Sequence, residues 1–200
     1  DQAGWTNDSI TAFPALTCLA ATWSDEMSAL YGKSIGEEAR YREKDVLLGP
    51  GVNIYRTPLC GRNFEYHSED PFVSGVMASA IVNGVQEMNV AATVKHFAAN
   101  NTEYQRLRSN SRVSARAMFE IYMKAFEIVI KHSNPWSIMT SYNHINGIKV
   151  CEDPNYCTGV IRNDFHYKGV LMSDFGNDSV HVKELAAGHD LKMPYGDPKG

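Results

Sequence analysis

The stretch Gly169-Val170-Leu171-Met172-Ser173-Asp174-Phe175-Gly176 decides which fold we expect for this chain. Its opening apolar run is short, and a run of this kind is typical of a buried strand. Asp174 follows the run directly and precedes a glycine turn. Parallel-barrel enzymes keep their reacting groups at the carboxyl ends of strands. A carboxylate there can serve as a nucleophile, a base or a metal ligand, and the rest of the chain decides which.

Other apolar runs and helical patterns alternate with this stretch along the chain. The runs predict strands at residues 45–52, 90–97, 136–143 and 169–175, with a short fifth at 189–194. Helical patterns lie between them, at residues 24–41, 72–87, 114–132 and 154–163. The alternation of strand and helix favours parallel βαβ units.

Residues at the helix starts and on one helix face support these boundaries. Ser24 is a candidate N-cap for the first helix, and Asp70 followed by Pro71 is a candidate start for the second. The third helix carries an apolar stripe, which we expect to pack against the strands. Its members are Met118, Ile121, Tyr122, Ala125, Phe126 and Val129.

Two α/β architectures fit this pattern, a doubly wound sheet and a (β/α)8 barrel. A nucleotide-binding sheet needs a glycine-rich turn that opens a helix, and the sequence contains neither GxGxxG nor GxxxxGK[ST]. Polar residues instead follow the apolar runs, at Lys95-His96, Tyr142-Asn143 and Asp174, which favours the barrel. A full barrel needs about 250 residues. With roughly five strands and no initiator Met, we expect a partial (β/α)8 TIM-type barrel, truncated at both ends.

Composition excludes some partners. The chain has 200 residues, of which 44% are hydrophobic and 21% charged, and a net charge of −4, which gives no electrostatic reason to expect nucleic acid. No apolar stretch is long enough to cross a membrane, and no signal peptide opens the chain. A cytoplasmic or a secreted location both remain open.

Metal and serine-nucleophile chemistry lack their usual patterns. There is no HExxH, no CxxC spacing and no GxSxG elbow, so we expect no metal and no cofactor. The four cysteines are Cys18, Cys60, Cys151 and Cys157. Cys151 and Cys157 could bridge a short loop, but we expect free buried thiols instead.

Two polar segments leave alternatives open when they are taken alone. Lys95-His96 is either a surface lysine beside a packed histidine or a pair that reaches one pocket at the strand end, and the amide-rich loop after it favours the pocket. Residues 61–71 are either a loop held together by Arg-Glu pairs or a surface that binds hydroxyl groups. Glu65, Glu69 and Glu103 are expected to be structural.

An ordered set of motifs makes the sequence specific. The set runs Gly61-Arg62-Asn63-Phe64-Glu65, Ser68-Glu69-Asp70-Pro71, Lys95-His96-Phe97-Ala98-Ala99-Asn100, Ser141-Tyr142-Asn143 and Met172-Ser173-Asp174-Phe175-Gly176. Together these motifs resemble the N-terminal barrel domain of glycoside hydrolase family 3, the β-glucosidase group. The resemblance covers nearly the whole chain, so it implies that residues 1–200 belong to the N-terminal catalytic domain and that a C-terminal α/β domain is absent.

The resemblance implies a role for each matching residue. Asp174 matches the nucleophile of a retaining glycosidase, which forms a covalent glycosyl-enzyme intermediate. The residues that match sugar-binding positions are Asp1, Arg62, Lys95, His96, Arg106, Met139 and Tyr142. Asp1 departs from the family pattern, because Gln2 follows it where Asp-Gly-Pro is usual. Nearby cations at Lys95, Arg62 and Arg106 are expected to favour the ionised form of Asp174.

The second carboxylate of the reaction is missing from this resemblance. In the family the general acid/base usually comes from a later domain, so we expect the isolated fragment to be inactive. The expected substrate of the parent enzyme is a small β-glycoside or oligosaccharide with a terminal non-reducing β-D-glucosyl residue. A β-xylosidase or other exo-glycosidase of the family, or a sugar-binding fragment without activity, remains the alternative. The hexosaminidase group fits less well, because Ala98-Ala99 stands where it has Pro-Gly.

Overall fold

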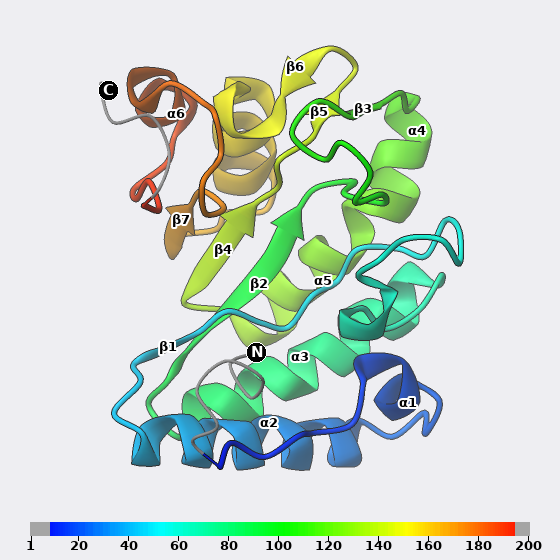
Figure 1. The fold of residues 1–200 in the computed structure, drawn as a ribbon, viewed down its shortest axis with the longest axis vertical. Helices are drawn as coiled ribbons and strands as arrows, with labels where there is room; N and C mark the ends of the chain where they lie inside the picture. Colours follow the sequence, from blue (N-terminus) through cyan, green and yellow to red (C-terminus); the bar gives the residue numbers. More distant parts are fainter. Residues whose placement is uncertain (1–8, 195–200) are drawn as a thin grey trace.

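A parallel sheet covered by helices forms the centre of the molecule. The structure, a computed structural model, describes residues 9–194. Four strands form the main sheet in the order β1-β2-β4-β7, and all neighbouring pairs are parallel (Figure 1). Their bounds are β1 Val46–Leu47, β2 Ala91–Phe97, β4 Ser137–Thr140 and β7 Val170–Met172. This arrangement confirms the parallel α/β architecture that the alternating pattern predicted.

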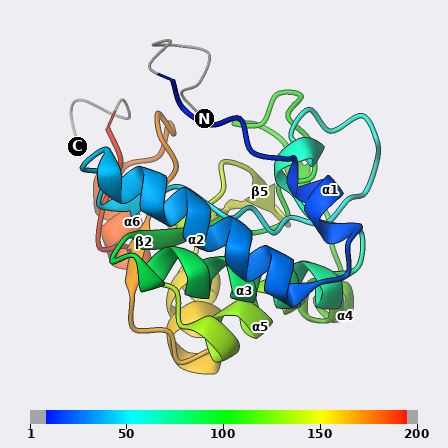
Figure 2. The ribbon, with the colours of Figure 1, turned by 90° about the horizontal axis from the view of Figure 1, so that it is seen from below.

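Long helices lie beneath the sheet, as the view from below shows (Figure 2). The α-helices are α1 Leu16–Ala20, α2 Asp25–Tyr41, α3 Pro71–Glu87, α4 Ala115–Ala117, α5 Lys124–Ser133 and α6 His181–Ala187. Short 3-10 turns lie at η1 Asn63–Glu65 and η3 Val150–Glu152, and π-helical segments at η2 Met118–Tyr122 and η4 Asn155–Asp164. The core lies between these helices and the sheet, where Phe97 of β2 meets Phe126 of α5 edge to face, with ring centroids 5.1 Å apart.

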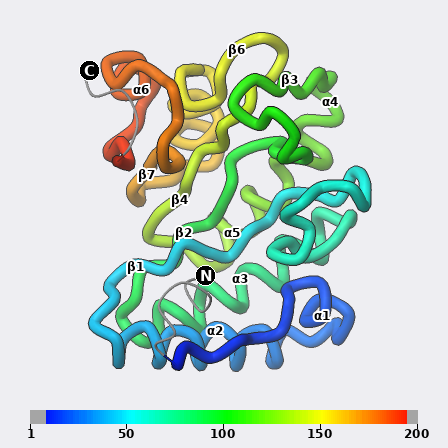
Figure 3. Tube along the Cα trace, in the orientation of Figure 1, coloured from blue at the N-terminus to red at the C-terminus, as the bar shows by residue number. Residues whose placement is uncertain are grey.

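The strand predicted at residues 45–52 is shorter than its apolar run. Regular pairing ends at Leu47, and Pro50, three residues later, has no N–H to give to the ladder. The chain nevertheless continues beside β2 (Figure 3). Lys95 N donates to Pro50 O at 3.1 Å, and Val52 N donates to Lys95 O at 2.7 Å.

The strand predicted at residues 90–97 is confirmed as β2, which ends at Phe97, but the remaining predicted strands end earlier than expected. Strand β4 stops at Thr140 rather than at residue 143, and β7 covers three residues of the predicted 169–175. The expected fifth strand at 189–194 is reduced to one parallel bridge between Met172 and Leu191. After β4 and β7, side chains bond to the loops: Ser141 Oγ donates to Ala98 O, and Asp174 Oδ1 accepts from Phe175 N.

Helix boundaries follow the capping signals. The Ser24 hydroxyl accepts a hydrogen bond from Met27 N at 3.1 Å, and the Asp70 carboxylate accepts from Phe72 N at 2.7 Å, so both predicted caps are confirmed. The helix predicted at 114–132 is divided into α4, η2 and α5, and the one at 154–163 is π-helical. The apolar stripe of the divided helix is confirmed, because Met118 and Phe126 are fully buried in the core.

Helices α2 and α3 approach so closely that glycine is required where they touch. A Cβ added at Gly32 would lie 2.3 Å from Ile81 O, and one added at Gly84 would lie 2.3 Å from Ala29 O. Both distances are shorter than any real contact of a Cβ atom, so each helix presents bare backbone to the other.

Several elements were not anticipated from the sequence. A small second sheet has the order β3-β5-β6, with bounds β3 Asn110–Ser111, β5 His144–Ile145 and β6 Ile148–Lys149. Its strands are two residues long, which is too short for a period of two to be visible. Helices α1 and α6 were missed for the same reason, since neither completes two full turns.

The remaining expectations concern the membrane and the cysteines. None of the helices within residues 9–194 combines the length and the apolarity that a membrane span requires. All four cysteines are free, and three of them are buried. The expectation of free buried thiols is confirmed for Cys151 and Cys157, whereas Cys18 is exposed.

Candidate functional site

The polar residues that follow the strands meet at one edge of the main sheet. The four strands are parallel, so their carboxyl ends lie at the same edge. Lys95 and His96 lie near the end of β2, Tyr142 follows β4 by two residues, and Asp174 follows β7 by two. Arg62, from the long loop after β1, joins them there through the contacts described below.

Asp174 is held by the turn that contains it. Its Oδ1 accepts a hydrogen bond from Phe175 N at 2.7 Å, and its backbone carbonyl accepts one from Asn177 Nδ2 at 3.0 Å. The other carboxylate oxygen, Oδ2, is buried and has no hydrogen-bond partner among residues 9–194. One oxygen of Asp174 is therefore fixed, and the other keeps its lone pairs free.

His96 lies opposite this free oxygen. Its Nε2 is 3.6 Å from Asp174 Oδ2, and its Nδ1 is 3.2 Å from the Tyr66 hydroxyl. The Asn53 side chain binds both backbone groups of His96, each at 2.9 Å. Residues 95 and 96 can both reach the site because the register of β2 against β4 shifts between Val94 and Phe97.

Glu65 connects the two cations of the site. Its Oε1 accepts a close hydrogen bond from Arg62 Nε, and its Oε2 lies 3.4 Å from Lys95 Nζ. All three side chains are at most one-fifth exposed. Glu65 thus links two residues of the site, Arg62 and Lys95, through its two carboxylate oxygens.

A second acidic residue positions the other arginine. Glu103 Oε2 lies 2.9 Å from Arg106 Nη1, and its Oε1 accepts from Asn100 Nδ2 at 3.1 Å. The Arg106 guanidinium lies over the Tyr142 ring, 4.4 Å from the ring centroid. The Tyr142 hydroxyl in turn donates a close hydrogen bond to Phe175 O, next to Asp174.

Burial controls the electrostatics of these groups. It raises the pKa of Asp174 above the usual range, against the opposing effects of the Phe175 N–H, Arg62, Tyr142 and Lys95. The expectation that nearby cations favour the ionised form of Asp174 is confirmed for Arg62 and Lys95, although burial outweighs their effect on the pKa. Burial lowers the pKa of Lys95, and Glu65 opposes that shift.

His96 is held neutral in this environment. Burial lowers the pKa of its imidazole well below the usual range, and the charges of Arg62, Lys95 and Arg106 lower it further. A neutral imidazole carries one N–H and one acceptor nitrogen, so its hydrogen bonds depend on which nitrogen holds the proton.

Met139 and Asp1 are the remaining residues that were predicted to bind the sugar. Met139 is buried in β4 and is paired with Met172 of β7, one step before the strand ends. Asp1 lies outside the described residues. Glu69 is exposed, and Glu103 pairs with Arg106.

Sequence reasoning missed two residues that contact the site directly. Tyr66 and Asn53 both bind His96, across separations of 30 and 43 residues in sequence. No local pattern signals such long-range contacts, although Tyr66 adjoins the Gly61–Glu65 motif.

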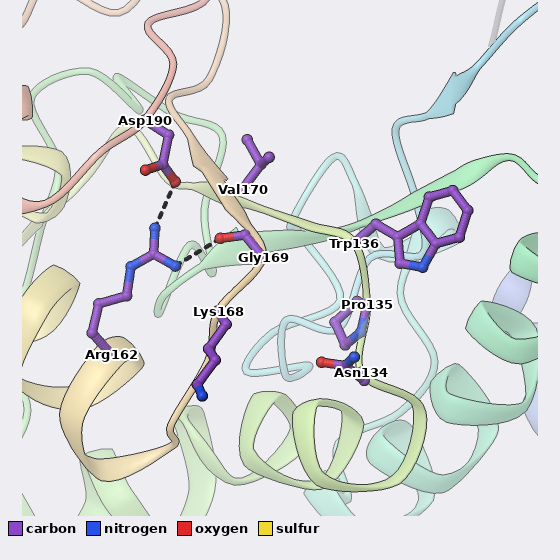
Figure 4. A pocket seen from close by; sticks show the side chains of 8 residues that line it. All are labelled: Asn134, Pro135, Trp136, Arg162, Lys168, Gly169, Val170 and Asp190. Atoms are coloured by element: carbon purple, nitrogen blue, oxygen red, sulfur yellow. Dashed lines mark hydrogen bonds and ion pairs between the residues drawn. The ribbon is translucent and has the colours of Figure 1, made fainter.

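A separate cavity lies at the opposite edge of the sheet (Figure 4). It has a volume of about 550 Å³ and is lined by residues that precede β4 and open β7, among them Trp136 and Gly169. Arg162 crosses it to pair with Asp190 at 2.6 Å and to bind the Gly169 carbonyl. This cavity holds none of the predicted site residues. Within residues 9–194, no cluster of three or more His, Cys, Asp or Glu side chains is suited to hold a metal ion.

Known protein families and sequences resemble this chain over most of its length. The model of the glycosyl hydrolase family 3 N terminal domain matches residues 2–194. A β-glucosidase of Bacteroides ovatus is 48% identical over 191 residues, which cover 96% of this chain and 26% of that protein. An exo-α-(1→6)-L-arabinopyranosidase of Bifidobacterium breve is 46% identical over 92% of this chain and 24% of its own length.

Solved structures agree with the sequence relatives. The structure of β-glucosidase 3B from Thermotoga neapolitana in complex with α-D-glucose superposes with a TM-score of 0.90 at 47% identity, over 94% of this chain and 27% of that one. The chain thus spans about a quarter of the length of the relatives it matches.

Proposed function

The chain belongs to glycoside hydrolase family 3, and from that premise we propose that its parent protein is a retaining glycoside hydrolase with Asp174 as nucleophile. One observation carries this proposal: Asp174 Oδ2 is buried at the carboxyl ends of the strands and accepts no hydrogen bond from residues 9–194. A nucleophilic carboxylate needs one oxygen whose lone pairs are not engaged, and Oδ2 meets that need among the described residues. Oδ1, fixed by Phe175 N, orients the group for attack on the anomeric carbon.

The cations and hydroxyl groups around Asp174 suit a sugar ring. Arg62, Lys95 and Arg106 offer several N–H donors, and His96 and Tyr142 lie beside these cations. Donors that face ring hydroxyls fix the sugar and strengthen as charge develops in the transition state. We assign these residues, with Met139, to the subsite that holds the cleaved sugar, and extend the assignment to Asp1.

The proposal also covers the parts of the enzyme beyond the described residues. We infer that the four-stranded sheet is part of a (β/α)8 barrel and that residues 1–200 belong to the catalytic domain. In a retaining enzyme a second carboxyl group must protonate the leaving oxygen. Glu65 and Glu103 are each engaged with a cation, so we assign the acid/base to a C-terminal domain of the same protein.

The proposed substrate is a terminal β-D-glucosyl residue of a small glycoside. Most of the similar proteins are β-glucosidases, which favours glucose over xylose. The similarity to an exo-α-(1→6)-L-arabinopyranosidase favours a second candidate, a terminal α-L-arabinopyranosyl residue. Turnover of aryl β-glucoside, β-xyloside and α-L-arabinopyranoside by the full-length enzyme separates these choices, and a clear preference for a pentoside would overturn glucose.

Replacement of Asp174 tests the mechanism. In the full-length enzyme, Asp174→Ala should lower turnover by several orders of magnitude, because covalent catalysis is lost. Azide should partly rescue this variant and give a product of inverted configuration. Asp178→Asn is a matched control from the same loop, since the exposed Asp178 pairs with Lys149, outside the site, and its replacement should have little effect on turnover.

Covalent labelling gives a direct readout of the same assignment. A 2-deoxy-2-fluoro glucoside slows breakdown of the intermediate, so the label should remain on Asp174 in the wild-type enzyme and be found there by mass spectrometry of peptides. Label on a different carboxylate would falsify the assignment of the nucleophile.

A further inference from the structure

We propose that Tyr66 is a positioning residue that fixes His96 in the tautomer with its proton on Nε2, so that this N–H points at the free oxygen of Asp174. This inference rests on the proposed role of Asp174 as nucleophile. Nothing in the composition of the site requires a tyrosine beside His96, but the contacts of Tyr66 give it this role.

The Tyr66 hydroxyl has one direction in which to donate. The side chain is 1% exposed, and within residues 9–194 the Nδ1 atom of His96, at 3.2 Å, is its one hydrogen-bond partner. Burial raises the pKa of Tyr66, so the phenol keeps its proton. A buried hydroxyl proton without an acceptor is costly, and therefore Nδ1 must be the acceptor and carry no proton.

The other side of the imidazole favours the same tautomer. Nε2 faces Asp174 Oδ2 at 3.6 Å. If Nε2 were the unprotonated nitrogen, its lone pair would face the lone pairs of a buried carboxylate, and the two would repel each other. A proton on Nε2 instead turns the contact into an attraction. The two contacts, one on each nitrogen, thus select one protonation pattern.

The backbone of His96 leaves the ring little freedom to escape this arrangement. Asn53 binds both the N–H and the carbonyl of His96. The Tyr66 and His96 rings meet edge to face, with centroids 6.2 Å apart. Gly51 lets the Tyr66 ring pack directly on backbone, because a Cβ there would lie 2.7 Å from a ring carbon.

The tautomer matters because the contact lies beside the attacking atom. An N–H near Oδ2 holds that oxygen in place without the short, strong hydrogen bond that would reduce its nucleophilicity. With the opposite tautomer, the carboxylate would lose this donor and be pushed away from His96. Tyr66 therefore acts on Asp174 only through His96.

A double-mutant cycle in the full-length enzyme tests this chain of contacts. Tyr66→Phe removes the hydroxyl and keeps the ring, and it should lower kcat/KM for an aryl glycoside by about three- to tenfold, the range expected for one lost hydrogen bond. In the His96→Gln background the same change should have no further effect, because the group it acts through is gone. Additive effects would overturn the proposal.

Tyr167→Phe is the matched control. Tyr167 is also a buried tyrosine, and its hydroxyl donates to a carbonyl, that of Val170, at the other end of β7. Its loss should leave kcat/KM unchanged and combine additively with His96→Gln. Thermal unfolding of each variant shows whether any loss of activity comes from misfolding.

The tautomer can also be observed directly, without turnover. In full-length enzyme labelled with 15N-histidine, the His96 resonance, assigned by its absence in His96→Gln, should show a protonated Nε2 and an unprotonated Nδ1. A protonated Nδ1 would contradict the proposal even if Tyr66→Phe fails to fold. Labelling of Asp174 by the fluoro sugar is independent of this outcome, so failure of the tautomer leaves the proposed function standing.

Discussion

Glu65 divides its two carboxylate oxygens between Arg62 and Lys95, and neither cation can easily find a replacement partner in a site this buried. Glu65→Gln keeps the shape but removes the charge. We predict that kcat/KM of the full-length enzyme falls about ten- to a hundredfold, the range for lost hydrogen bonds to charged groups. Steady-state kinetics on an aryl β-glucoside measure this loss.

The pH profile of the same variant gives a second readout. Glu65 raises the pKa of Lys95 against the effect of burial, so its removal should lower that pKa further and move the alkaline limb of activity to lower pH. Glu127→Gln is the control, since Glu127 also contacts two lysines but lies on the surface of α5. Equal losses in both variants would contradict a specific role for Glu65.

Tyr142 is predicted to influence the ionisation of Asp174. Its hydroxyl lowers the pKa of the Asp174 carboxyl, which burial otherwise raises. Tyr142→Phe should therefore raise that pKa. Because the nucleophile works only when ionised, the acid limb of kcat/KM should move to higher pH. An acid limb that stays in place, or moves to lower pH, would show that Tyr142 does not act on Asp174.

Among the elements, the contact between α2 and α3 is the least tolerant of added atoms. Gly84→Ala would place a methyl group 2.3 Å from Ala29 O and 2.6 Å from Lys33 N. We predict a loss of about 1–3 kcal/mol in the free energy of unfolding, typical of overpacking, measured by urea unfolding.

Gly159→Ala is a control for which no loss in the free energy of unfolding is expected. It lies within η4, where the nearest atom to an added Cβ is 3.7 Å away. Gly159→Ala should therefore be neutral or stabilise by about 0.5–1 kcal/mol, because alanine loses less backbone entropy than glycine in a helix. Loss of stability in both variants would mean that the α2–α3 contact is not special.

The sequence predicted elements best where a local interaction sets a boundary. Ser24 and Asp70 cap their helices through contacts two or three residues away, so their positions can be inferred from the chain itself. The ends of strands were predicted less well. Thr140 and Met172 end β4 and β7 because the next residues turn to form the site, and an apolar run carries no sign of that turn.

In the site, too, some features could be predicted from the sequence and others could not. Parallel strands bring their carboxyl ends together, so the proximity of Lys95, His96, Tyr142 and Asp174 could be predicted from strand order alone. The bridging role of Glu65 and the contact of Tyr66 with His96 depend on how a long loop folds back over β2, which no spacing in the sequence records.

At the scale of the whole molecule, we predict that the isolated 200-residue chain hydrolyses aryl β-glucoside slowly or not at all. Asp174 alone cannot protonate the leaving oxygen, and the proposed acid lies outside this chain. Side-by-side assays of the isolated chain and the full-length enzyme measure the difference. Robust activity of the isolated chain would mean that Glu65, Glu69 or Glu103 is the acid after all.

Strand β7 lies at one side of the described sheet, and the loop that follows it carries Asp174. Next to β7, the Leu191 carbonyl accepts from Ser173 N, and Leu191 bridges Met172. A cut in the full-length polypeptide after this segment would leave the nucleophile on one piece and the proposed acid on the other. Two inactive halves fused to interacting partners should reassemble, and the sugar cleaved by the restored enzyme would then report that the partners had met.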